Sequence, residues 1–104
     1  MANIKMRILL VRPWTEELAP LRAELRGAGI DAQLVRIDFE PALNAALVRD
    51  RFDAVIFDPK TPGITRELIE TRLREHRRAA PVVVLDSVST IAHDLKRAMA
   101  EQRN

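Results

Sequence analysis

The sequence predicts an α/β fold with a parallel sheet. Three short runs are apolar nearly throughout, 6–11, 54–58 and 81–86, and a fourth run, 31–37, is more mixed. Continuous runs of Val, Ile and Leu are typical of strands buried on both faces of a parallel sheet, and the mixed run is typical of an edge strand. Segments with helical periodicity separate the runs. This strict alternation favours a parallel sheet with right-handed crossovers.

The first helical segment follows the run 6–11. Its apolar stripe repeats with helical spacing and consists of Leu18, Leu21, Leu25 and Ala28. Gly29 suits the end of this helix. With Thr15 as N-cap, Pro20 would lie just beyond the free N–H groups of the first turn. We therefore expect either a loose first turn or a later start.

Three further helices are predicted, over 40–51, 65–78 and 90–102. Pro41 lies in the first turn of the second helix, where its missing N–H is harmless. The apolar stripes of the three helices comprise Ala42, Leu43, Ala46 and Leu47; Leu68, Ile69 and Leu73; and Ile91, Leu95, Ala98 and Met99. Each helix follows one strand run, which gives four strand–helix units in a single domain, 1–104.

Composition excludes several classes of protein. Apolar residues make up 47% and charged residues 31% of the 104 residues, as in ordinary globular chains. There is no cysteine, so disulfides and thiolate metal sites are excluded. His76 and His93 lie far apart without partners at metal-ligand spacing. The longest apolar run near the start, Ile8 to Val11, is too short for a signal peptide or membrane span, and we expect a cytoplasmic protein.

Basic residues are densest in "RLREHRR", Arg72 to Arg78, although the net charge is only +2. The cluster could attract phosphates, which makes a small nucleic-acid-binding protein one hypothesis. The solvated end of a helix, where cations are favoured, is the preferred interpretation. No aromatic residues are interleaved for base stacking, so nucleic acid is not the expected partner.

Polar side chains follow the predicted strands, where sites form in open α/β sheets. They are Arg12, Pro13 and Trp14 after the first strand, Asp58 after the third, and Asp86 and Ser87 after the fourth. Lys60 and Thr61 flank Asp58, and Thr61 is interpreted as a turn residue. Trp14 either covers the pocket, anchors a partner or packs over the sheet edge. No Ser-His-Asp order or Gly-rich phosphate loop is present, so no enzyme is predicted.

Several segments together resemble the receiver domain of two-component response regulators, over residues 6 to about 100. They are "ILLV", "GAGI", "FDAVIFDPKTPG" and "PVVVLDS", in that order. The most specific is D-x-x-x-P-G, here Asp58, Pro62 and Gly63. The resemblance implies a receiver (flavodoxin-like) three-layer sandwich, with four strands in the order 2-1-3-4 and without the family's fifth strand–helix unit.

In that family the residue matching Asp58 is the phosphoacceptor. Two acids after the first strand help to hold Mg²⁺, a hydroxyl ends the fourth strand, and a lysine follows the fifth. Here Arg12 and Pro13 replace the acids, Asp86 takes the hydroxyl position with Ser87 next, and the lysine is missing. A site without two carboxylates should bind Mg²⁺ poorly. The sequence therefore predicts no metal cofactor and no phosphorylation.

Two uses of Arg12 stay open. The guanidinium could lie between Asp58 and Asp86 and supply the positive charge that the metal gives the family. Alternatively, Arg12 reaches solvent and Asp58 only caps the loop after its strand.

The resemblance implies a pseudo-receiver in signal transduction, acting by protein–protein interaction with a kinase or effector. The apolar edge of the fourth strand, or the helix 90–102, could pair with a second copy as a homodimer. Alternatively, that helix connects to a further module of a larger protein. A phosphoacceptor receiver of a phosphorelay, with Asp58 as acceptor and the pocket completed by a partner, is the second hypothesis.

Overall fold

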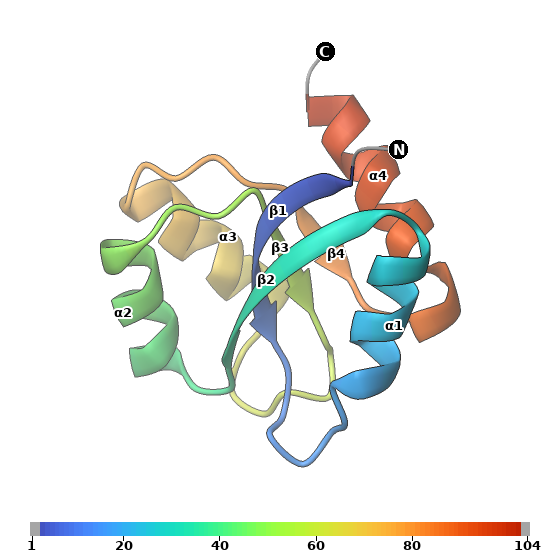
Figure 1. Ribbon diagram of the computed structural model, residues 1–104. Coiled ribbons are helices and arrows are strands. Elements are labelled where there is room, and N and C mark those ends of the chain that lie inside the picture. The colour runs from blue at the N-terminus through green and yellow to red at the C-terminus, as the bar shows by residue number, and fades with distance from the viewer. Residues whose placement is uncertain (1–2, 103–104) are drawn as a thin grey trace.

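The computed structural model describes residues 3–102, and its strands and helices alternate as predicted (Figure 1). In chain order they are β1 (Ile4–Val11), α1 (Ala19–Gly27), β2 (Ile30–Ile37), α2 (Glu40–Arg49), β3 (Ala54–Phe57), α3 (Arg66–Glu75), β4 (Val82–Val84), the 3₁₀ helix η1 (Val88–Thr90) and α4 (Ile91–Gln102). None of the helices in this part of the chain has the length and apolar character needed to cross a membrane.

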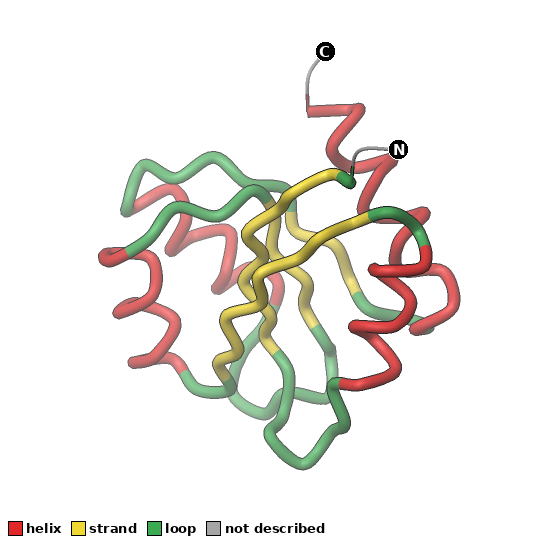
Figure 2. The backbone as a smooth tube through the Cα atoms, in the orientation of Figure 1, coloured by secondary structure: helices red, strands yellow, loops and turns green. Residues whose placement is uncertain are grey.

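The four strands form one parallel sheet in the order β2-β1-β3-β4, which confirms the predicted topology. Val11 of β1 lies opposite Ile37 of β2 and Phe57 of β3. The mixed strand β2 is an edge, as its composition predicted. All four strands end on the same side of the sheet, where the loops gather at the bottom of Figure 2.

Two helices cover each face of the sheet and produce two separate cores (Figure 1). The core under α1 and α4 includes Ile8, Leu10, Leu21, Leu25, Ile56, Ile91 and Leu95. The core under α2 and α3 includes Leu9, Val11, Leu43, Leu47, Val55, Phe57, Ile69 and Leu73. Successive residues of β1 and β3 therefore alternate between the two cores, as the pleat of a strand buried on both faces requires.

Helix α4 closes the face that α1 covers. Right-handed crossovers place α1 on one face and α2 and α3 on the other, because the chain first moves outward to β2 and then back past β1. A helix leading from β4 to a further outer strand would lie beside α2 and α3. Instead, Ile91, Ala92 and Leu95 are buried in the core with α1, and Lys96 Nζ donates to the carbonyl of Ala28 at 2.7 Å. The predicted apolar stripe of this helix is thus used within the domain.

Local signals explain most helix boundaries. Helix α1 begins late, with Leu18 as N-cap and Pro20 in its first turn, which is the second of the two starts we expected. Gly29, with φ of +80°, follows α1 in the left-handed conformation that glycine adopts without strain. Thr65 caps α3, because its hydroxyl accepts from the amide of Leu68 at 3.1 Å. Strand β4 is shorter than its predicted range.

Candidate functional site at the carboxyl ends of β1 and β3

The ladder of the sheet continues one residue beyond β1 and β3. The amide of Arg12 donates to the carbonyl of Ile37 at 3.1 Å, and the amide of Asp58 donates to that of Val11 at 2.8 Å. Because Val11 and Phe57 are partners in the register, Arg12 and Asp58 are neighbours. Both side chains leave the sheet on the face of α1 and α4, by the alternation of a pleated strand.

Arg12 and Asp58 form a buried ion pair. Arg12 Nε lies 3.8 Å from Asp58 Oδ2, and the two side chains are only 10% and 4% exposed. The distance is too long for a hydrogen bond. Within residues 3–102, Nε and Nη1 of Arg12 are buried without a hydrogen-bond partner. The guanidinium therefore acts on Asp58 mainly through its charge, in a site with little water to screen it.

Asp58 also organises the loop that follows it. Its Oδ1 accepts from the amide of Lys60 at 3.0 Å, and its carbonyl accepts from the amide of Thr61 at 3.0 Å. The Thr61 hydroxyl, buried with the loop, donates to the same carbonyl at 2.8 Å. Gly63 has a φ of +77°, which explains the glycine of the D-x-x-x-P-G motif. Asp58 is thus both an ion-pair partner and the cap of a turn, and Thr61 is the expected turn residue.

Arg36 of β2 holds the loop after β1, a role that sequence analysis missed. Its guanidinium donates to the carbonyls of Pro13 and Glu16, the latter at 2.6 Å. Its Cζ lies 4.9 Å from the centre of the Trp14 ring. Trp14 is 64% exposed, and its ring lies against Arg36 of the edge strand. Arg36 interrupts the apolar pattern of β2, but that signal alone could not locate its partners.

Lys60 and Glu16 join the two loops of the site, with Nζ and Oε1 2.8 Å apart. This hydrogen-bonded ion pair lowers the pKa of Glu16 and raises the pKa of Lys60. The pair links loops that are 44 residues apart in sequence. Sequence spacing gives no signal for such a contact, and Glu16 was not among the predicted site residues.

We expect the Lys60→Met substitution to raise the titration midpoint of Glu16 toward its usual value. Glu16 has a lower pKa in the folded chain than in the unfolded chain. Its ion pair therefore stabilises the fold at pH values above the unfolded pKa, and this stabilisation is lost as the pH falls through the folded pKa. Lys60 has a higher pKa in the folded chain than in the unfolded chain. Its contribution to stability is therefore present below the unfolded pKa and is lost as the pH rises through the folded pKa. An NMR titration of the Glu16 carboxyl carbon measures the shift, and equal midpoints in both proteins would contradict the pairing.

Asp86 and Ser87 do not join Asp58, contrary to the hypothesis that Arg12 lies between two acids. Val84 is the register partner of Phe57, so Leu85 is the residue beside Asp58, and its amide donates to Phe57 at 2.7 Å. Asp86 is one residue further, is exposed, and forms none of the ion pairs found in residues 3–102. Ser87 instead caps η1, where its hydroxyl accepts from the amide of Ser89 at 3.3 Å.

The donor set beside Asp58 does not fit Mg²⁺. This ion needs several oxygen ligands, usually including one or two carboxylates. Asp58 is the carboxylate that directly follows β3 and faces the guanidinium of Arg12, and Glu16 of the neighbouring loop is already paired with Lys60. Across residues 3–102, no three His, Cys, Asp or Glu side chains come together as a metal site would require. A cation here would be repelled by Arg12.

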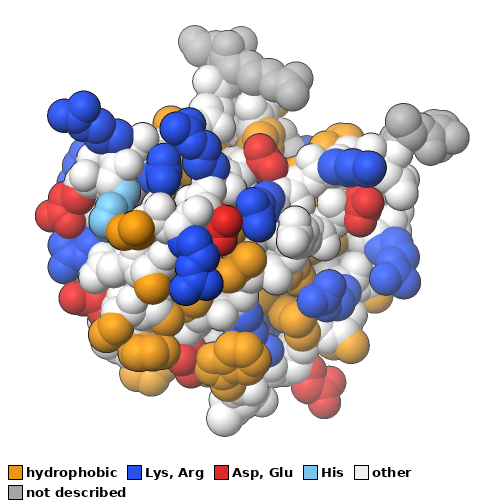
Figure 3. Space-filling view, turned by 60° about the vertical axis from the view of Figure 1, so that its left-hand side comes forward, with side chains coloured by type: hydrophobic (Ala, Val, Ile, Leu, Met, Phe, Trp, Pro, Cys, Tyr) orange, Lys and Arg blue, Asp and Glu red, His pale blue; other side chains and the backbone are white. Residues whose placement is uncertain are grey.

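Two large apolar side chains are exposed in the loops after β1 and β2. Trp14 is 64% and Phe39 is 56% exposed. Figure 3 shows hydrophobic side chains gathered toward the lower end of the molecule, where these loops lie. Exposed aromatic residues of this kind are enriched at protein interfaces.

The parallel sheet has the strand order 2-1-3-4, is covered by helices on both faces, and carries an acid after β3. This arrangement matches the receiver fold, which confirms the fold expected from the sequence. A similar solved structure is the receiver domain of a sensor histidine kinase from Pseudomonas aeruginosa, which holds a magnesium ion in its active-site cleft. The TM-score is 0.67 over 92% of this chain and 98% of that one, at 16% sequence identity. No family model and no curated protein matches the sequence.

Proposed function

We propose that this chain is a pseudo-receiver: a signal-transduction domain that acts by protein–protein contact and is not switched by phosphorylation of Asp58. The observation that carries this proposal is the buried guanidinium of Arg12, 3.8 Å from the Asp58 carboxylate. It supplies a permanent positive charge where a phosphoacceptor site needs a metal ion, so that charge does not depend on a ligand. The domain would therefore have one stable state and no catalytic turnover.

The same contacts disfavour phosphoryl transfer to Asp58. A carboxylate that attacks phosphorus needs a free oxygen and a cation that holds the phosphoryl donor. Here Oδ1 accepts from Lys60 and Oδ2 faces Arg12, and the carboxyl group is 4% exposed. The exposed Trp14 and Phe39, in the loops after β1 and β2, are better suited to contact with another protein.

We expect no phosphorylation of the wild-type chain by a small phosphodonor, such as acetyl phosphate, with Mg²⁺. Intact-mass analysis measures the modification. We further expect the double variant Arg12→Asp/Pro13→Asp to bind Mg²⁺, because it places two acids beside Asp58 and removes the guanidinium. The fluorescence of Trp14, the single tryptophan of the chain, reports that binding.

Two outcomes would overturn this proposal. Stoichiometric modification of the wild-type chain that is abolished by Asp58→Asn would make Asp58 a phosphoacceptor, the alternative function. Failure of the folded double-acid variant to bind Mg²⁺ would show that Arg12 is not what keeps the metal out. Circular dichroism of both variants separates loss of binding from loss of the fold.

The expected partner is a signalling protein such as a kinase or effector, and a second copy of the chain is the other candidate. A receiver fold supports the first, and the open edge of β4 offers a backbone to which a partner strand can add. The nucleic-acid alternative gains little support, because cations of its cluster are engaged within the domain. Arg72 pairs with Glu75 at 2.9 Å, and Arg78 donates to the carbonyl of Leu47 at 3.1 Å.

A further inference from the structure

Strand β4 leaves one side of its backbone open. The amide of Val55 donates to Pro81 at 2.9 Å, and the amide of Leu85 donates to Phe57 at 2.7 Å. Residues of a parallel strand bond alternately to the two sides, so Val82 and Val84 direct their amide and carbonyl groups away from β3. No hydrogen bond within residues 3–102 reaches these groups from beyond the edge. The edge can therefore hydrogen-bond a further strand.

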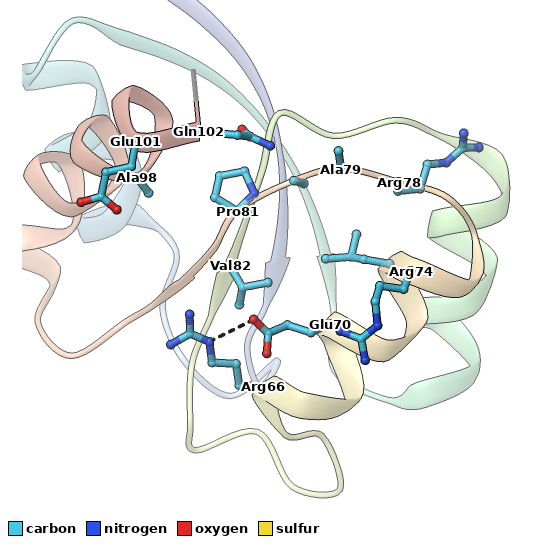
Figure 4. A pocket seen from close by; sticks show the side chains of 12 residues that line it. Arg66, Glu70, Arg74, Arg78, Ala79, Pro81, Val82, Ala98, Glu101 and Gln102 are labelled. Atoms are coloured by element: carbon cyan, nitrogen blue, oxygen red, sulfur yellow. Dashed lines mark ion pairs between the residues drawn. The ribbon is translucent and has the colours of Figure 1, made fainter. Parts of the chain in front are cut away.

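A groove runs along this edge between α3 and α4. Two adjoining cavities of about 500 and 330 Å³ share the lining residues Arg66, Val82, Ala98 and Glu101. Figure 4 shows Val82 in the middle of the groove, with α3 on one side and α4 on the other. A strand laid in this groove would direct alternate side chains toward α3 and toward α4.

The two flanks of the groove differ in charge. On the α3 flank, Arg66 and Arg74 are exposed, and the nearby Glu70 pairs with Arg66 at 3.6 Å. On the α4 flank, among lining residues within 3–102, Glu101 and Asp94 outnumber the cation Arg97. The α3 flank is thus net positive, and the α4 flank is net negative.

A second copy is a poor occupant for this groove. Two identical β4 edges pair symmetrically only in antiparallel orientation, about a twofold axis normal to the sheet. That operation places the α3 flank against the partner's α3 flank and the α4 flank against the partner's α4 flank. Like charges would meet on both faces of the joined sheet, which is destabilising. The charges instead suit a strand with acidic side chains toward α3.

We infer that the β4 edge binds an extended segment of another protein as a fifth strand, with acidic side chains directed toward Arg66 and Arg74. This inference rests on the proposed function as a protein-interaction domain and specifies its partner. Backbone hydrogen bonds to Val82 and Val84 supply affinity, and the acidic side chains supply specificity. The apolar side chains of the segment then face α4, on the side of Val83 and Ala98.

The test uses a peptide of sequence Lys-Glu-Val-Glu-Val-Glu-Lys, blocked at both ends, in which alternate residues are acidic. We expect its addition to the full chain to shift the NMR signals of the Val82 and Val84 amides. Arg66→Glu/Arg74→Glu, which changes two exposed side chains, should weaken binding at least tenfold. The same variant should instead bind the peptide in which lysine replaces each glutamate, because the charge of the flank is reversed.

Val84→Pro serves as a second variant that targets the backbone. Its lost amide faces away from β3, so the ladder within the domain stays intact, as for prolines on edge strands. We expect a folded protein that no longer binds the acidic peptide. The Asp58 phosphorylation assay is independent of these measurements, so failure of the edge inference and failure of the pseudo-receiver proposal are distinguishable.

Three results would overturn the inference. The first is an absence of amide shifts at Val82 and Val84 at millimolar peptide. The second is equal binding of the acidic peptide by the wild type and by Arg66→Glu/Arg74→Glu. The third is a concentration-dependent shift of the same amides without peptide, together with a dimer in sedimentation, which would assign the edge to a second copy.

Discussion

Replacing Arg12 with methionine is expected to lower the free energy of unfolding by about 3–5 kcal/mol, since removal of one partner leaves a buried charge without compensation. The Asp58 side chain is 4% exposed and would keep, within residues 3–102, the amide of Lys60 as its hydrogen-bond partner. Methionine preserves most of the volume of the arginine stem, so the loss is electrostatic and not a packing defect. Urea unfolding monitored by circular dichroism measures the change.

A double-mutant cycle isolates the pair. Asp58→Asn should also destabilise the protein, because Arg12 is then the uncompensated charge, while asparagine can still accept from the Lys60 amide. Arg12→Met/Asp58→Asn removes both charges and should be much more stable than the sum of the two single changes predicts. A coupling energy near zero would show that the two side chains do not stabilise each other.

Arg97→Met is the matched control for this cycle. Arg97 Nε lies 3.9 Å from Glu101 Oε1, nearly the same distance as in the buried pair, but the two side chains are 68% and 74% exposed. Water and salt screen such a pair, so its loss should change stability by less than about 1 kcal/mol. A loss for Arg12→Met as small as that of the control would contradict a compensating role for Arg12.

Leu95→Ala is expected to lower the free energy of unfolding by about 2–5 kcal/mol, the usual range for truncating a fully buried leucine. Leu95 of α4 is 0% exposed and lies in the same core cluster as Leu21 and Leu25 of α1. The change creates a cavity between the two helices and the sheet. Chemical unfolding again measures it. A domain of this size is marginally stable, so a loss in this range removes much of its stability.

His93→Ala is the control for Leu95→Ala, because His93 lies in the same helix and is exposed. Its effect should fall within about 0.5 kcal/mol. Similar small effects at both positions would show that α4 is not part of the domain core, and would support the alternative that this helix connects to another module.

The strand topology was predictable because each strand carries its own signal. Residues 8–11 of β1 and all of β3 are buried on both faces and contain no polar side chains. The polar positions of β2 likewise marked it as an edge. The turn after Asp58 was also predictable, because Pro62 and Gly63 act on the backbone within a few residues of themselves.

The site was only partly predictable. Each residue at the carboxyl edge lies directly after a strand or in the loop that follows it. Arg12 follows β1, Asp58 follows β3, and Thr61 lies in the loop after β3. Asp86 follows a strand too, yet the register of β4 against β3 sets it one residue beyond the neighbour of Asp58. That offset depends on how two strands pair, and no composition or spacing within either strand specifies it.

The four strand–helix units, the parallel sheet and the acid at its edge follow from the amino-acid sequence alone, because periodicity and turn chemistry act over a few residues. Three features became visible in the folded chain: Arg12 lies against Asp58, Arg36 and Lys60 hold the neighbouring loops, and α4 packs beside α1. Those outcomes depend on crossover direction, register and the burial of charge. These are properties of segments brought together from distant parts of the chain, and they arise only when the whole domain folds.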